Sequence, residues 1–174
     1  GLSLSAEDIY SVNKSSLKDA VVALSWGSCT GEIISKEGLL LTNHHCADDL
    51  IQFHSTTEKD YLKNGFWAMN KSEELANENL TASILFRIEN VTERVFSKIN
   101  GSGTEDDRRK KIRAVANEIS NEISDTSHYT SRLRSFYGGN EFYLFIYETF
   151  LDVRLVGAPP SSIGKFGGDT DNWM

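Results

Sequence analysis

The chain has 174 residues, of which 39% are hydrophobic and 25% charged, and its formal net charge at pH 7 is −7. These fractions are typical of a globular protein, and no apolar stretch is long enough to cross a bilayer, so we expect no membrane span. The acidic balance argues against nucleic acid as a partner, because a phosphate-binding surface needs clustered positive charge.

The first third of the chain predicts a short helix followed by paired strands. Ser5 and Asp8 have the spacing of a capping box, which places a helical turn directly after Ser5. Three short apolar runs follow, with turn-forming residues at 35–38 between the last two. The strands are expected at residues 20–24, 32–35 and 39–42. Short strands at this spacing favour an antiparallel all-β core.

The rest of the chain alternates between helical and extended patterns. Residues 51–79 are polar and partly helical, and the alternation of residues 82–88 predicts a half-buried strand. Thr104 can cap a helix over about 104–124, whose apolar stripe contains Ile112, Val115, Ile119 and Ile123. Two further strands are expected at 142–150 and 152–156, before a glycine-rich loop over 161–174.

Two histidines and a cysteine stand together in "LLLTNHHCADD", residues 39–49. Adjacent residues on an extended chain point to opposite sides, and zinc ligands are usually two to four residues apart, so we expect no metal site here. A strand end is, however, a rigid place for a catalytic base. Cys29 and Cys46 can form a disulfide, serve as a metal pair or remain free, and composition does not choose among these.

Three stretches resemble the bacterial dipeptidyl-peptidase 7 and dipeptidyl-peptidase 11 family: "GSCTGEIISKEGLLLTNHHCA", "STTEKDYLKNGFWA" and "DVRLVGAPPSSIGKFGGDTDNWM". The resemblance runs from about Leu4 to Met174. It implies a mainly β fold with inserted helices, as part of a chymotrypsin-like double β-barrel peptidase domain. It also implies a serine exopeptidase, without a cofactor, in the periplasm or on the surface of a bacterium.

The resemblance assigns roles to five residues. His45, rather than His44, would be the general base of a serine triad, and Cys29 would pair with Cys46 in a disulfide that fixes the strand end. Such a loop of about sixteen residues is worth roughly 3 kcal/mol in the entropy model. Asn172 and Trp173 would bind the free α-amino group of a peptide substrate, because an amide oxygen beside an indole ring suits an ammonium ion.

The remaining triad residues are expected outside this chain. In the family the aspartate closely follows the tryptophan-methionine pair and the serine lies far downstream, whereas no Gly-x-Ser-Gly sequence occurs here. Asp169 and Asp171 would lie in the loop leading to the amine site. We therefore expect residues 1–174 to be the N-terminal part of the peptidase domain, with the first barrel and the helical excursion, and the rest beyond residue 174. Alone, this part should hydrolyse nothing.

Two other functions remain open from the sequence. The same fold could serve as a catalytically dead peptide-binding or adhesion module, because only one triad residue is visible. A trypsin-like endopeptidase is disfavoured by the "DNWM" loop, which would block extended substrates. For the exopeptidase, the partners are peptides with a free N-terminus, and a homodimer of the full-length protein is left open. The preference for an acidic or a hydrophobic residue before the cut depends on residues outside this chain.

Overall fold

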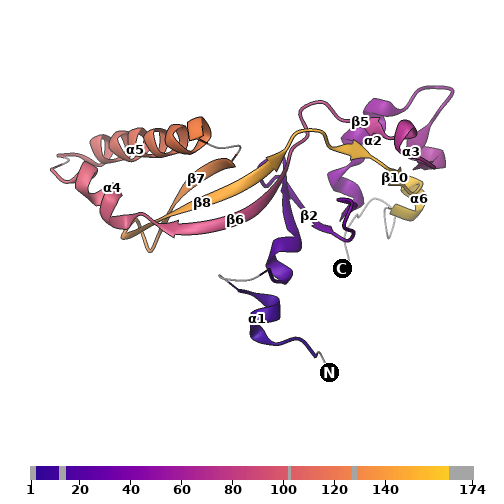
Figure 1. Ribbon diagram of the computed structural model, residues 1–174. Helices are drawn as coiled ribbons and strands as arrows, with labels where there is room; N and C mark the ends of the chain where they lie inside the picture. Colours follow the sequence, from indigo (N-terminus) through magenta and orange to yellow (C-terminus); the bar gives the residue numbers. More distant parts are fainter. Residues whose placement is uncertain (1–2, 12–14, 102, 127–128, 165–174) are drawn as a thin grey trace. The chain divides into compact units, whose positions relative to one another are not determined.

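The computed structural model describes residues 3–11, 15–101, 103–126 and 129–164 (Figure 1). The chain divides into two units, each treated by itself below. Unit 1 contains residues 1–19 and 83–149, and unit 2 contains residues 20–82 and 150–174. The candidate catalytic histidine lies in unit 2.

Unit 1 is built on a sheet in which the strand order is β6-β8-β7. Its strands are β6 (Ala82–Asn90), β7 (Tyr129–Phe136) and β8 (Glu141–Phe150). β7 and β8 form an antiparallel hairpin whose register runs from Tyr129 opposite Glu148 to Phe136 opposite Glu141. Tyr137, Gly138 and Gly139 all have positive φ in the turn, which is why glycine occupies two of these positions.

Helices α4 (Thr92–Ile99) and α5 (Glu105–Thr126) pack on this sheet (Figure 1). The side chains of Val115 and Ile119 on α5 meet those of Phe142 and Leu144 on β8 in one buried cluster. The predicted cap of α5 is confirmed, because the Thr104 hydroxyl accepts a hydrogen bond from the backbone N–H of Asp107 at 3.1 Å. The predicted apolar stripe is confirmed as well, with Ile112 and Ile123 partly buried at its ends. The apolar face that the sequence pattern predicts is therefore the face of α5 that packs against the sheet.

The start of the chain carries helix α1 (Ala6–Ile9) and the 3-10 helix η1 (Leu17–Ala20). The Ser5 side chain accepts from the backbone of Asp8, and the Asp8 side chain accepts from the backbone of Ser5. The predicted capping box is thus present. It holds one helical turn that has no buried residue of its own.

Unit 2 begins with an antiparallel meander in the order β3-β2-β1. Its strands are β1 (Val21–Leu24), β2 (Cys29–Ile33) and β3 (Leu40–Thr42). Short elements then follow: η2 (His44–Cys46), α2 (Asp48–His54), α3 (Tyr61–Asn64), β4 (Phe66–Trp67), η3 (Lys71–Glu73), β5 (Leu75–Ala76), β9 (Arg154–Leu155), β10 (Gly157–Ala158) and α6 (Ser161–Gly164). β4 pairs with β10 and β5 with β9. Ile51, Leu155 and Ala158 form a buried cluster in this part.

Three predictions about elements need correction. The strand expected at 32–35 lies at 29–33, because the Ser35 hydroxyl accepts from the backbone N–H of Leu39 at 3.0 Å and so belongs to the turn. The strand expected at 152–156 is reduced to β9 (Arg154–Leu155), which pairs with β5. The half-buried alternation of β6 is wrong, since Phe86 and Ile88 are exposed while Ser83 is buried.

The coarse fold class is confirmed: antiparallel sheets with helices make up the described residues. The helical excursion expected at about 104–124 corresponds to α5 at Glu105–Thr126. No helix in the described part of the chain is long and apolar enough to cross a membrane.

Candidate active site

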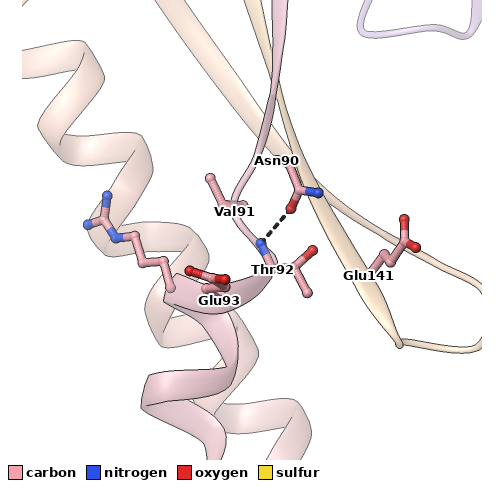
Figure 2. A pocket seen from close by; sticks show the side chains of 6 residues that line it. Asn90, Val91, Thr92, Glu93 and Glu141 are labelled. Carbon is pink, nitrogen blue, oxygen red and sulfur yellow. Dashed lines mark hydrogen bonds between the residues drawn. The ribbon is translucent and has the colours of Figure 1, made fainter.

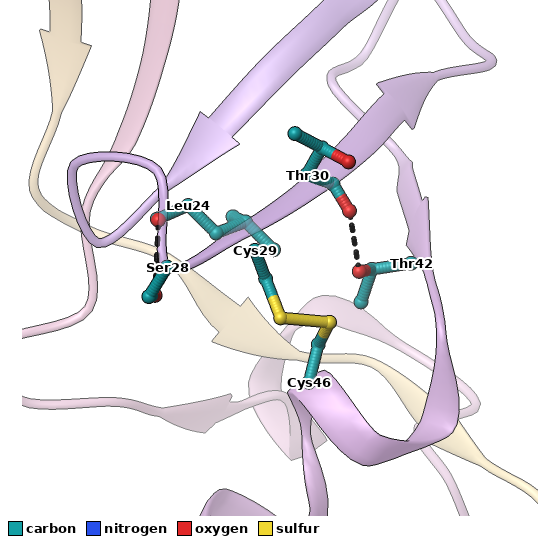
Figure 3. The surroundings of a disulfide bond; sticks show 6 residues. All are labelled: Leu24, Ser28, Cys29, Thr30, Thr42 and Cys46. Atoms are coloured by element: carbon teal, nitrogen blue, oxygen red, sulfur yellow. Dashed lines mark hydrogen bonds between the residues drawn. A yellow bond between two sulfur atoms is a disulfide. The ribbon is translucent and has the colours of Figure 1, made fainter. Parts of the chain in front are cut away.

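A disulfide ties the short turn after β3 to strand β2 (Figure 3). Cys29 and Cys46 are bonded, with their Cα atoms 6.0 Å apart. Beside this bond, the Thr42 hydroxyl donates to the Thr30 carbonyl at 2.8 Å, linking β3 to β2 through a side chain. The turn that carries both histidines is therefore attached to β2 by a covalent bond, and the hydrogen bond links the preceding strand β3 to the same strand.

His45 is exposed and lies next to this disulfide. One of its ring nitrogens and the sulfur atoms of Cys29 and Cys46 all lie within 4.8 Å of one another. This is a spacing that a metal ion could bridge, but both sulfurs are joined in the S–S bond and are not available as thiolate ligands. What remains is an imidazole on a braced turn, which is the arrangement that a general base needs.

His44, although adjacent in sequence, has the opposite environment. Its side chain is only 6% exposed, and its Nε2 atom lies 3.1 Å from Asp48 Oδ1 and 3.3 Å from Ser161 Oγ. A nitrogen occupied by two oxygen neighbours is poorly placed to accept a proton from a substrate or nucleophile. The His44 side chain is thus buried beside two oxygen atoms, whereas His45 is exposed.

A third histidine belongs to a polar network that the sequence did not reveal. His54 Nε2, at the end of α2, lies 2.9 Å from Oδ1 of Asn77, which is a buried residue. Both the side-chain amide and the backbone N–H of Asn77 donate to the Val153 carbonyl, each at 3.2 Å. Because the Asn77 amide nitrogen already donates, its oxygen must accept, and the proton of the neutral His54 ring is assigned to Nε2. This network links three segments of unit 2.

The predicted amine-binding residues lie outside the described part of the chain. This holds for Asn172 and Trp173, and also for Asp169 and Asp171 in the same loop. Among the described residues, the predicted site is therefore represented by His45 and by the Cys29–Cys46 disulfide.

A separate hollow of about 620 Å³ lies in unit 1 at the start of α4 (Figure 2). Asn90 precedes the N-cap residue of the helix, Val91, and its side-chain oxygen accepts from the backbone N–H of Thr92 at 3.0 Å. Glu93, Arg94 and Glu141 also line the hollow, and Arg94 donates to Glu122 at 2.6 Å. Two of its polar residues are therefore engaged elsewhere: Asn90 with the first turn of α4, and Arg94 in joining α4 to α5.

Known proteins resemble this chain along its whole length. The whole chain, residues 1–174, matches the family model described as peptidase S46. An Asp/Glu-specific dipeptidyl-peptidase from Flavobacterium psychrophilum is 49% identical over 174 residues, which is 100% of this chain and 24% of the relative. A dipeptidyl-peptidase 7 from Capnocytophaga gingivalis is 47% identical over 173 residues, 99% of this chain and 24% of the relative. The chain thus spans about a quarter of the length of these curated relatives.

Solved structures of a related protein also match the whole chain. A crystal structure of DPP11 from Porphyromonas endodontalis in complex with substrate matches with a TM-score of 0.88 at 46% identity. The match covers 100% of this chain and 26% of that one. A crystal structure of the same protein in complex with the dipeptide Arg-Glu matches with a TM-score of 0.86 at 45% identity.

Proposed function

The chain belongs to the peptidase S46 family, and from this premise we propose that it is part of a serine dipeptidyl peptidase. The enzyme would remove dipeptides from the free N-terminus of peptides by way of an acyl-enzyme. The observation that carries the proposal is the environment of His45, an exposed imidazole on a turn that a disulfide fixes to β2. Relatives named for dipeptidyl-peptidase activity, 49% and 47% identical, support it.

His45 would act as the general base. It would take the proton from a serine hydroxyl as that oxygen attacks the scissile carbonyl, and would then give the proton to the leaving amine. The serine and the orienting aspartate of the triad are expected in the part of the parent protein outside this chain. A chymotrypsin-like double β-barrel would bring them together, with the β3-β2-β1 meander belonging to the first barrel. Without the nucleophile the isolated chain would be inactive.

Restriction to dipeptides would come from recognition of the substrate's α-ammonium group. Asn172 can offer a side-chain oxygen to that cation and Trp173 the face of an indole ring. Such a contact requires a free N-terminus, so internal cleavage would be disfavoured. One relative is named as Asp/Glu-specific, and the name of another at similar identity gives no specificity, so the test includes both acidic and hydrophobic residues before the cut.

The disulfide supports a location outside the reducing cytoplasm. Disulfides persist in oxidising compartments, and a bond that braces a catalytic turn would be lost where thiols are kept reduced. We therefore propose a location in the periplasm or on the surface of a bacterium.

The test uses the full-length protein, as wild type and as His45→Ala, on dipeptide substrates that release a fluorescent dye, with free and with acetylated N-termini. We expect wild type to release dye only from the free amine, and His45→Ala to be slower by several powers of ten. His54→Ala is the matched control, because His54 lies in the same unit but in a buried network with Asn77. It should stay within about tenfold of wild-type kcat/KM. An inert wild type would favour a peptide-binding module instead.

A further inference from the structure

His44 is held between two segments of unit 2 that are far apart in sequence. Its own turn, η2, leads directly into α2, where Asp48 lies one helical turn ahead. Its second neighbour, Ser161, begins helix α6, which is 117 residues away in the chain. A single imidazole thus contacts both the turn that carries His45 and the short helix near the end of the described chain.

The geometry at Nε2 assigns the proton of this ring. If Nε2 carried no proton, its lone pair would lie beside Asp48 Oδ1, 3.1 Å away, and the two electron-rich atoms would repel each other. With the proton on Nε2, the N–H donates to Ser161 Oγ at 3.3 Å while the Asp48 carboxylate beside it stabilises the donor. His44 therefore acts as a donor toward α6 and is oriented by an acid from α2.

The side of the ring around Nδ1 packs against Gly164. A Cβ atom built on Gly164 would lie 2.5 Å from His44 Cγ and 2.7 Å from Cε1, and it would also overlap Nδ1. No side chain fits there unless the ring moves. Backbone hydrogen bonds from Ile163 and Gly164 to the Pro160 carbonyl, at 2.8 and 2.9 Å, shape α6 around this contact. The imidazole is consequently fixed by a hydrogen bond at one edge and by close backbone packing at the other.

We propose that His44 is a positioning residue that fixes α6 to the turn carrying His45. Asn172 and Trp173 follow Gly164 by eight and nine residues in the sequence, so the segment that contains them continues directly from the end of α6. His44 thereby relates the proposed base to the proposed amine-binding residues without touching the substrate. This inference rests on the proposed function and adds to it a residue that governs substrate binding rather than the chemical step.

If His44 has this positioning role, its removal should raise KM and leave kcat nearly unchanged. If the ring is removed, α6 loses its fixed attachment, and the amine-binding segment is less well placed while His45 keeps its disulfide brace. In the full-length protein, we expect His44→Ala to raise KM for dipeptide substrates with a free N-terminus by about fivefold or more, with kcat within about threefold. His44→Gln, which can still place an N–H near Ser161, should recover most of the wild-type KM.

A double-mutant cycle tests the contact itself. Gly164→Ala should raise KM in the wild-type background, because the added methyl group overlaps the imidazole, but should have little further effect in the His44→Ala background. Equal effects of Gly164→Ala in both backgrounds would overturn the proposal. So would a His44→Ala variant whose KM equals that of wild type, or whose kcat alone falls.

Two controls separate this inference from the function on which it rests. Thermal unfolding and labelling with a serine-reactive fluorophosphonate give the folded, competent fraction of each variant, so that a loss of folded protein is not read as a change in KM. If wild type cleaves none of the dipeptide substrates, the proposed function fails, and the positioning role fails with it. If wild type is active, His45→Ala is inactive and His44→Ala is unchanged in KM, only the positioning role fails.

Discussion

Cys29 on β2 is bonded to Cys46, the residue directly after His45. The bond closes a loop with a sequence separation of 17 residues. In the entropy model a loop of this size stabilises the folded state by about 3 kcal/mol. We expect the Cys29→Ala/Cys46→Ala double variant to lose free energy of unfolding of this order, measured by denaturant titration. In the full-length protein kcat/KM should also fall, because the turn that carries His45 is released.

Reduction supplies the control for this prediction. A reducing agent should bring wild type down to the stability of the double variant and leave the double variant itself unchanged. If both proteins respond equally, the effect of the reductant does not pass through this disulfide.

Asn77 is the centre of the His54 network, and its removal should destabilise unit 2. Asn77→Ala leaves the His54 ring without its buried partner and removes one of the two hydrogen bonds to the Val153 carbonyl, which keeps the bond from the backbone N–H of residue 77. Unsatisfied buried polar groups cost about 1–3 kcal/mol each, so we expect a loss in this range by denaturant unfolding. Asn64→Ala is the matched control, since Asn64 is exposed at the end of α3, and it should change stability by less than about 0.5 kcal/mol. Equal losses would contradict a structural role for the network.

Local chemistry explains which elements the sequence predicted well. The caps at Ser5 and Thr104 depend on residues three positions away, and both are present as predicted. The stripe of α5 repeats every three or four residues and needs no knowledge of the partner. Caps and apolar stripes can therefore be predicted from a few neighbouring residues, without knowledge of the rest of the fold.

Features that depend on distant partners were missed. Strand β7 contains two serines and two arginines, and its extended conformation comes from pairing along its whole length with β8. The different environments of His44 and His45 likewise have no local signature, because Ser161 and Gly164 are contributed from more than a hundred residues away. The choice of His45 as the candidate base came from family resemblance, and adjacent histidines alone would not have separated the two.

The core of unit 1 should respond strongly to truncation at Ile119. This side chain is 2% exposed and packs in the cluster that joins α5 to the sheet. Ile119→Ala should cost about 2–5 kcal/mol of unfolding free energy, since it removes buried methyl groups and leaves a cavity. Ile9→Ala makes the same chemical change at a side chain that is 42% exposed, and should cost far less. Similar losses at the two positions would show that α5 does not form the core.

Glu122 provides a pH-dependent link between α4 and α5. Its side chain accepts a hydrogen bond from Arg94 at 2.6 Å, and this bond holds the pKa of the Glu122 carboxyl below its usual value of 4.5. A carboxyl whose folded pKa is lowered adds stability above its unfolded pKa, and that stability is lost as the pH falls through the folded value. In wild type, the free energy of unfolding should therefore fall more steeply below about pH 4.5 than it does in Arg94→Ala.

The titration can be followed directly by NMR of the Glu122 side-chain carboxyl carbon. In Arg94→Ala its pKa should rise toward 4.5, because the donor that stabilises the charged form is gone. Lys98→Ala is the milder comparison: Lys98 lies 3.4 Å from Glu118 and acts on Glu122 only through its charge, so the pKa should move less. High salt should weaken the Lys98 effect first, since a longer-range charge interaction is screened more than a hydrogen bond. An identical Glu122 pKa in wild type and Arg94→Ala would mean that the link between α4 and α5 does not depend on this pair.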